Sequence, residues 1–122
     1  MPTICHFEIP AQDMERASAF YRNIFSWDIS PAPGMPNYWF VNTKSSDGNE
    51  GIGGAIMPKQ QGGEIMMYFD VASVSDTTAR VEQEGGEVLV PKTAVPSYGY
   101  FAVCQDTEGN TFGLWQPDPS AM

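Results

Sequence analysis

The sequence has little of what several classes of protein require. Only 6 of its 122 residues are Lys or Arg, against 15 that are Asp or Glu, and the formal net charge is −9. That charge repels phosphate backbones and anionic lipid, so we expect neither nucleic acid nor a membrane as a partner. No apolar run approaches the roughly 20 residues that cross a bilayer, and the first ten residues lack the pattern of a secretion signal. We therefore expect a cytoplasmic protein.

Cysteine and histidine are scarce as well. Cys5 and Cys104 are far apart and lie in apolar, strand-like runs, which argues against a disulfide framework and against a CxxC metal or redox motif. We expect two buried free thiols. His6 is the only histidine, so any catalysis that pairs an imidazole with a serine or cysteine nucleophile would have to use it.

Turn-forming and core-forming residues are abundant instead. The chain has 12 Gly and 10 Pro, and 42% of its residues are hydrophobic. This composition predicts one domain, residues 1–122, built from short strands and many turns rather than from a helix bundle.

The order of predicted elements occurs twice. Residues 4–9 alternate as a half-buried strand does, and Asp13 is placed to cap a helix. Strands are expected at 26–30, 38–43 and 51–57. After a linker at 58–63, a strand at 65–71 precedes a helix that Ser73 caps and Gly85-Gly86 ends. The last three strands are expected at 87–90, 100–104 and 111–116.

The two halves also match residue by residue. A shift of sixty places Ile9 on Phe69 and His6 on Met66, and a shift of sixty-one places Asp47-Gly48-Asn49 on Glu108-Gly109-Asn110. The predicted fold class is therefore α+β, with two β-α-β-β-β modules (about 1–58 and 64–118) that form a curved mixed sheet around a cavity. We expect eight residues beneath the helices: Cys5, Phe7, Ile9, Phe20, Ile24, Met67, Phe69 and Val71.

Two segments resemble a known superfamily. His6-Phe7-Glu8-Ile9-Pro10-Ala11-Gln12-Asp13 resembles the first strand and the Asp-led helix start of the vicinal oxygen chelate superfamily, also called the glyoxalase / bleomycin resistance / extradiol dioxygenase superfamily. Asp106-Thr107-Glu108-Gly109-Asn110 and the strand after it are similar to the family's hairpin and last strand. The chain is identified as a single-domain glyoxalase-like member.

The resemblance implies four positions for the ligands of a divalent metal. In this sequence they are His6, Ile52, Met66 and Gly113. Only His6 carries a suitable donor, because an aliphatic chain, a thioether and a glycine supply none of the oxygen and imidazole ligands that such an ion prefers. We therefore expect no cofactor. The alternative is a zinc, nickel or manganese ion held by His6 with the carboxylates of Glu8 and Glu50, which are expected on the same face.

Two functions remain open. The first is a module that binds or sequesters a small molecule without metal, in a cavity lined by Met66, Tyr68, Trp115, Ile52 and Gly113. The second is a glyoxalase-related lyase or isomerase that uses Glu8 and His6 for proton transfer with a divalent metal. The family resemblance also implies a homodimer, to which the strands at Trp39–Val41 and Gly54–Met57 are expected to contribute.

Overall fold

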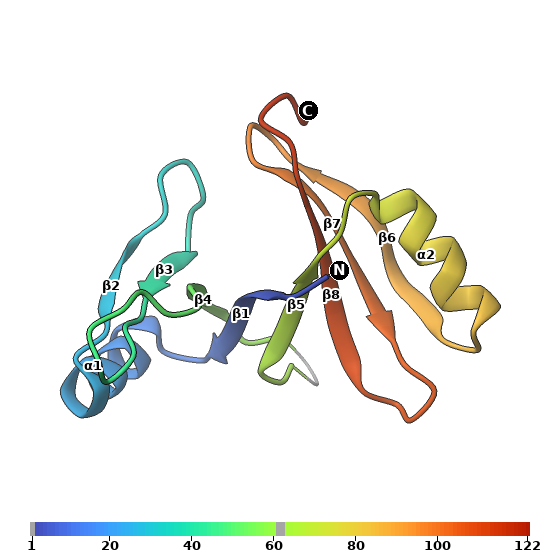
Figure 1. Ribbon diagram of the computed structural model, residues 1–122. Coiled ribbons are helices and arrows are strands. Elements are labelled where there is room, and N and C mark those ends of the chain that lie inside the picture. The colour runs from blue at the N-terminus through green and yellow to red at the C-terminus, as the bar shows by residue number, and fades with distance from the viewer. Residues whose placement is uncertain (1, 61–62) are drawn as a thin grey trace. The chain divides into compact units, whose positions relative to one another are not determined.

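The computed structural model describes residues 2–60 and 63–122, so residues 61 and 62 of the predicted linker lie outside the described part. The elements follow one another as β1 (Ile4–Ala11), α1 (Met14–Phe25), β2 (Asp28–Pro31), β3 (Trp39–Asn42), β4 (Gly54–Pro58), β5 (Met66–Asp70), α2 (Val74–Gln83), β6 (Glu87–Val95), β7 (Gly99–Gln105) and β8 (Thr111–Pro117) (Figure 1). The β-α-β-β-β order occurs twice, which confirms the predicted α+β class and its two modules. None of the described helices is long and apolar enough to cross a membrane.

The chain divides into two compact units. The first unit is His6–Met66, and the second combines Met1–Cys5 with Met67–Met122. In the second unit the start of β1 lies against β5, where the backbone N–H of Asp70 donates to the Thr3 carbonyl (3.0 Å). The Cys5 thiol donates to the Tyr68 carbonyl (3.6 Å). Each unit therefore contains one module, apart from the first residues of β1 and Met66 of β5.

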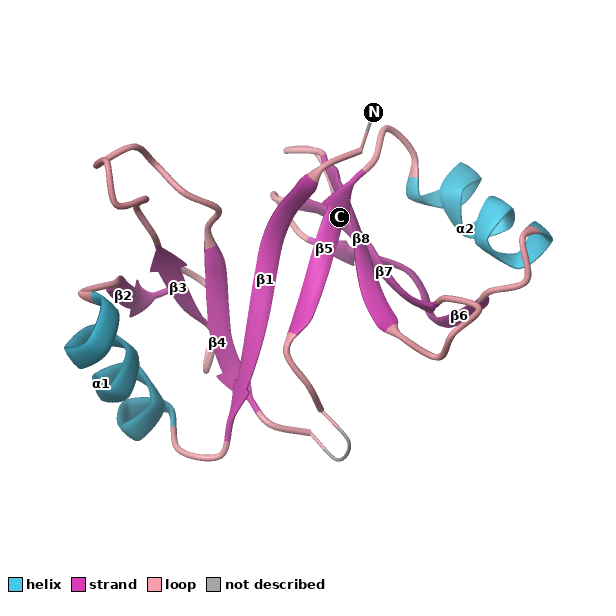
Figure 2. Cartoon of the chain, turned by 60° about the horizontal axis from the view of Figure 1, so that its bottom comes forward, coloured by secondary structure: helices cyan, strands magenta, loops and turns pink. Residues whose placement is uncertain are grey.

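Both modules use the same sheet topology (Figure 2). In the first, the strand order is β2-β3-β4-β1, with antiparallel β2-β3-β4 and with β1 parallel to β4. In the second, the order is β6-β7-β8-β5, with antiparallel β6-β7-β8 and with β5 parallel to β8. Helix α1 packs on β2 and β4, and α2 packs on β6, β7 and β8. The helix leaves the opposite face of each sheet to other contacts.

The helix ends follow the predicted capping residues. The Asp13 carboxylate accepts a hydrogen bond from the Arg16 backbone N–H (2.9 Å), and the Ser73 hydroxyl accepts one from Asp76 (3.1 Å). Gly85 adopts a φ of +95°, and Gly86 N–H donates back to the Val81 carbonyl (2.8 Å). This is a left-handed glycine termination, which satisfies carbonyls at the end of α2.

Each module has its own apolar core on the helix side of its sheet. The core of the first module contains Ile9, Ala11, Ile29, Val41 and Ile56, with Met14, Ala17 and Tyr21 of α1 packed against it. The core of the second contains Val71, Val74, Ala102, Cys104 and Leu114. The strand alternation predicted for β1 is correct, because Ile9 is buried and Phe7 packs against the same core.

Three of the eight residues expected beneath the helices are exposed. Phe20, Ile24 and Met67 have exposed fractions of 57%, 51% and 48%. On α1 the inward line runs through Met14, Ala17 and Tyr21, and Phe20 is turned about 100° away from Tyr21. Strands β2, β3 and β4 are only four or five residues long, so the sheet beneath α1 covers a single row of side chains on the helix. Met67 is exposed because α2 packs on β6–β8 rather than over β5.

Candidate functional site

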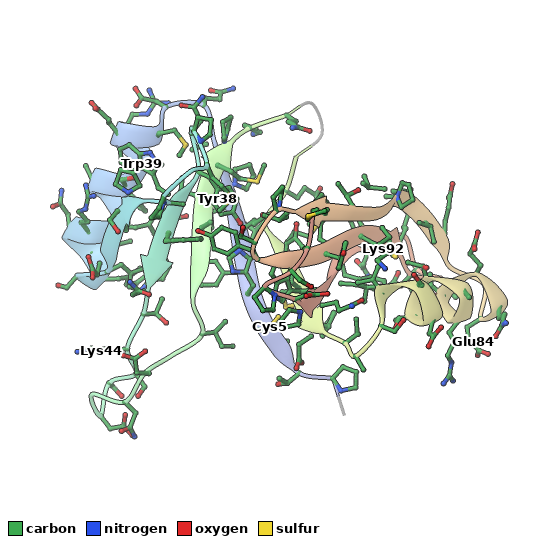
Figure 3. The ribbon with its side chains drawn as sticks, turned by 90° about the horizontal axis from the view of Figure 1, so that it is seen from above. Cys5, Tyr38, Trp39, Lys44, Glu84 and Lys92 are labelled. Atoms are coloured by element: carbon green, nitrogen blue, oxygen red, sulfur yellow. The ribbon has the colours of Figure 1, made fainter. Side chains whose placement is uncertain are left out.

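A tyrosine joins the two residues of β1 that the sequence singles out. The Tyr38 hydroxyl lies 2.8 Å from Nε2 of His6 and donates to Oε2 of Glu8 at 2.7 Å. Tyr38 directly precedes β3 and is labelled in Figure 3. All three side chains are half-buried. We refer to His6, Tyr38 and Glu8 as the polar triad.

Strand register explains why these residues meet. Glu8 pairs with Ala55 on β4, and Ala55 pairs with Phe40 on β3. Residues that pair across strands lie on the same face of a sheet, and so does every second residue along one strand. His6, two residues before Glu8, and Tyr38, two residues before Phe40, therefore lie on that face too. It is the face opposite α1. Because Ala55 carries only a methyl group, the long Tyr38 side chain can cross above β4 and reach β1.

The hydrogen bonds define where the protons lie. A phenol has one hydrogen, and Tyr38 donates it to the Glu8 carboxylate, so the bond from His6 must use Nε2–H as donor. Burial lowers the pKa of His6, and the negative charge of Glu8 raises it by a smaller amount. Because the pKa of His6 lies below its ordinary value, the imidazole is neutral at neutral pH, protonated on Nε2.

In the second module the face opposite α2 is aromatic. Tyr68 is buried and pairs with Gly113 of β8, where any side chain would collide with the Tyr68 ring. Trp115, two residues further along β8, pairs with Phe101 of β7, and its ring covers Gly99. Glycine at positions 113 and 99 therefore lets two large rings lie flat against the sheet.

Ile52 does not hold the position that the sequence predicted. Strand β4 begins at Gly54, and Ile52 precedes it with 45% of its surface exposed. The helix caps Asp13 and Ser73 support an offset of sixty between the modules. At that offset Glu8 matches Tyr68, so their partners Ala55 and Gly113 are equivalent. The sequence match failed because residues 51–53 follow the turn without joining the strand.

The side chains at the metal positions do not fit a hard divalent ion. With Ala55 in place of Ile52 at the second position, the four metal-ligand positions carry an imidazole, a methyl group, the Met66 thioether and no side chain at Gly113. Such a set supplies one suitable donor. Within residues 2–60 and 63–122 no three His, Cys, Asp or Glu side chains gather closely enough to hold a metal ion. The polar triad engages both Nε2 of His6 and Oε2 of Glu8 through Tyr38.

The predicted site residues divide between the two units. His6, Glu8, Ile52 and Met66 belong to the first, and Tyr68, Gly113 and Trp115 belong to the second. Within the first unit the structure brings His6 and Glu8 together, and within the second it brings Tyr68 and Gly113 together. That both groups line one cavity stays a prediction. A groove of about 420 Å³ beside α1 is lined instead by Asp13, Arg16, Phe20, Lys59 and their neighbours.

The two β-α-β-β-β modules, each with the same strand order, define the class of the protein as a glyoxalase / bleomycin resistance fold. The bleomycin resistance protein-like N-terminal family matches residues 3–43. A glyoxylase-like domain-containing protein from Didymella fabae is 31% identical over 120 residues, covering 91% of each chain. The chain therefore belongs to the glyoxylase-like domain proteins of the vicinal oxygen chelate superfamily.

Other relatives are more distant or longer. The candidate glyoxylase CFP32 of Mycobacterium tuberculosis is 29% identical over 89 residues, which are 73% of this chain. The chain spans only 24% of the length of that relative.

Among solved structures, a methylmalonyl-CoA epimerase variant from Streptomyces coelicolor, in complex with 2-nitronate-propionyl-CoA, matches with a TM-score of 0.67 and 16% identity. The match covers 98% of this chain and 97% of the epimerase. A Staphylococcus aureus protein matches with a TM-score of 0.60 and 21% identity, over 96% of each chain. At these identities the matches establish the fold.

Proposed function

We propose that this protein binds a small molecule without a metal ion and that the polar triad recognises the ligand's polar group. The observation that carries the proposal is the Tyr38 hydroxyl, which bonds to both His6 and Glu8. These bonds hold an imidazole and a carboxylate in place before a ligand arrives. Such preorganisation lowers the cost of ordering side chains on binding.

The chemistry of the triad limits what it can recognise. Glu8 is an acceptor when ionised, whereas Tyr38 is both a donor and an acceptor. The net charge of −9 disfavours an anionic ligand. We therefore propose a neutral or cationic ligand that carries at least one hydrogen-bond donor.

Apolar contact would supply most of the affinity. Trp115 and Tyr68 present large rings, and Met66 presents a polarizable thioether, which suits a flat or apolar molecule. This part of the proposal extends the sequence hypothesis that these residues line the binding cavity together with Gly113. A protein of this kind would bind or sequester its ligand unchanged.

One observation favours a second function, a glyoxalase-related isomerase or lyase. Hydrogen bonds connect Glu8 to Tyr38 and Tyr38 to His6, and burial lowers the pKa of His6. A neutral imidazole can accept a proton near neutral pH, and the bonded chain could pass charge to the carboxylate. In this alternative Glu8 and His6 exchange protons with the substrate, and the enzyme uses a divalent metal.

The first experiment is a thermal-shift screen of a small-molecule library against the protein, run in parallel with EDTA and with added zinc. A ligand that binds the native state raises the unfolding temperature. We expect neutral or cationic aromatic compounds to stabilise the protein equally in both conditions. Stabilisation that EDTA abolishes and zinc restores would contradict metal-free binding and favour the enzyme.

The aromatic contribution has its own test. We expect Trp115→Ala to weaken binding of the best compound by roughly 1–3 kcal/mol, because burial of a large ring is lost. Phe25→Ala is the matched control, since Phe25 is an exposed aromatic residue of α1. Calorimetric titration of both variants measures the change. Equal affinity in Trp115→Ala and the wild type would remove Trp115 from the site.

A further inference from the structure

We infer that Tyr38 blocks a divalent ion from the two donor side chains that remain in this site, His6 and Glu8, because its phenol oxygen lies between them. The inference rests on the proposed function and adds a role for a residue that sequence patterns did not single out. Tyr38 is a positioning residue here. In this role it acts by holding the imidazole and the carboxylate.

The first step of the argument is geometric. One oxygen atom lies 2.8 Å from Nε2 of His6 and 2.7 Å from Oε2 of Glu8. An imidazole nitrogen and a carboxylate oxygen are the donors that zinc, nickel and manganese accept in proteins. Here a single oxygen atom bridges the imidazole nitrogen and the carboxylate oxygen, as a metal ion would bridge them. The bridge is the hydroxyl group of Tyr38, the residue directly before β3.

The second step concerns protons. A metal takes the lone pair of a neutral imidazole nitrogen, so Nε2 would have to lose its hydrogen to bind one. In the polar triad that hydrogen is donated to Tyr38, while the Tyr38 hydrogen is donated to Glu8. Metal binding at Nε2 and Oε2 would therefore break two hydrogen bonds and shift the imidazole to its other tautomer. The phenol competes with the ion for both ligands.

The third step is that the fold itself holds Tyr38 there. Its aromatic ring packs edge-on against Phe40, with ring centroids 5.9 Å apart, and stacks on His6 at 6.4 Å. The small side chain of Ala55 lies between β3 and β1 on the same face. The ring is thus fixed by packing as well as by its hydroxyl, so removing the hydroxyl alone leaves the ring in position.

The test is the zinc affinity of Tyr38→Phe, measured by competition with a chromophoric chelator. We expect the variant to bind zinc about tenfold more tightly than the wild type, because both ligands lose their competing partner. The double variant Tyr38→Phe, His6→Gln should lose this gain. Tyr100→Phe removes the same hydroxyl from the second module and should match the wild type. A folded Tyr38→Phe that binds zinc no more tightly would overturn the inference.

A second measurement uses the wild type alone. Because His6 is the only histidine, the nitrogen NMR spectrum of the protein contains a single imidazole. We expect the Nε2–H tautomer, unchanged when one equivalent of zinc is added. The Nδ1–H tautomer would overturn the assigned role of Tyr38, even if Tyr38→Phe does not fold.

The two proposals can fail separately. If ligand binding by the wild type resists EDTA but Tyr38→Phe gains no zinc affinity, only the role of Tyr38 is lost. If EDTA removes ligand binding by the wild type, metal-free function itself is wrong, whatever Tyr38→Phe does.

Discussion

His6 shows how much one side chain depends on its neighbours. Alternation along residues 4–9 places it on the face opposite the first helix, with Glu8, and both statements follow from sequence. Its hydrogen-bond partner is thirty-two residues away in Tyr38. The strand-like run at 38–43 puts Tyr38 and Phe40 on one face, yet nothing in that run says which strand lies across from it.

Burial of His6 makes the stability of the protein depend on pH. The pKa of His6 is lowered in the folded state, so the unfolded chain takes up the proton more readily. Stability should be fully present above the ordinary imidazole pKa of roughly 6.5 and should fall as the pH drops below it. Urea unfolding between about pH 7.5 and 5 measures this loss.

The variant His6→Gln isolates that effect, because glutamine does not titrate and can still donate to Tyr38. Its stability should be nearly flat over the same range. Hydrogen bonds in turns lower the pKa values of three aspartates, Asp47, Asp106 and Asp118. Their protonation reduces the stability of the protein only at more acidic pH. An identical slope in His6→Gln and the wild type would show that other groups carry the dependence.

At the scale of elements, glycines decide how closely side chains lie over the strands. Gly54 of β4 pairs with Phe7 of β1, and the Phe7 ring lies directly over it. A Cβ atom at Gly54 would lie 2.5 Å from that ring, whereas one at the neighbouring Gly53 would meet nothing closer than the Val41 carbonyl at 3.5 Å. Two adjacent glycines therefore differ in what they tolerate.

We expect Gly54→Ala to destabilise the protein by roughly 1–3 kcal/mol, because the whole Phe7 ring would have to move within a packed core. Gly53→Ala is the matched control and should change stability by less than about 0.5 kcal/mol. Chemical denaturation of both variants gives the comparison. Equal stabilities would mean that Phe7 can leave β4 at little cost.

For the whole molecule, the repeated topology is the main result. Each module returns its last strand parallel to its first, β4 beside β1 and β8 beside β5. The turns that precede these last strands are alike as well, with Gly48 at φ +88° and Gly109 at φ +86°. Equal turn chemistry at an offset of sixty-one is what made the repeat visible in the sequence.

We expect a homodimer at micromolar concentration, because large apolar side chains such as Phe20, Ile24 and Phe25 stay exposed. Of the strands expected to contribute, Val41 and Ile56 are packed in the first module's own core, so any contribution would come from the half-buried residues beside them. Sedimentation velocity should show a dimer that persists in 1 M salt. A monomer under these conditions would contradict the prediction.

The sequence by itself determined the elements, their order, both helix caps and the face of β1 that carries His6 and Glu8. These features depend on local periodicity and on turn residues, which short segments contain in full. The resemblance added the family, because His6–Asp13 and Asp106–Asn110 are themselves short segments. It also implied a metal-ligand position at Ile52, whereas the register of β4 places Ala55 at the position equivalent to Gly113.

Tertiary structure alone decided the contacts across strands. Register and packing between segments far apart in sequence decide that Tyr38, just before β3, reaches β1. They also decide which glycine lies under which ring and which side of α1 is covered. A shift of one residue in the pairing of β3 with β4 or of β4 with β1 would separate Tyr38 from His6 and Glu8. The polar triad exists because β3, β4 and β1 pair in one register, with a small Ala55 between the outer two.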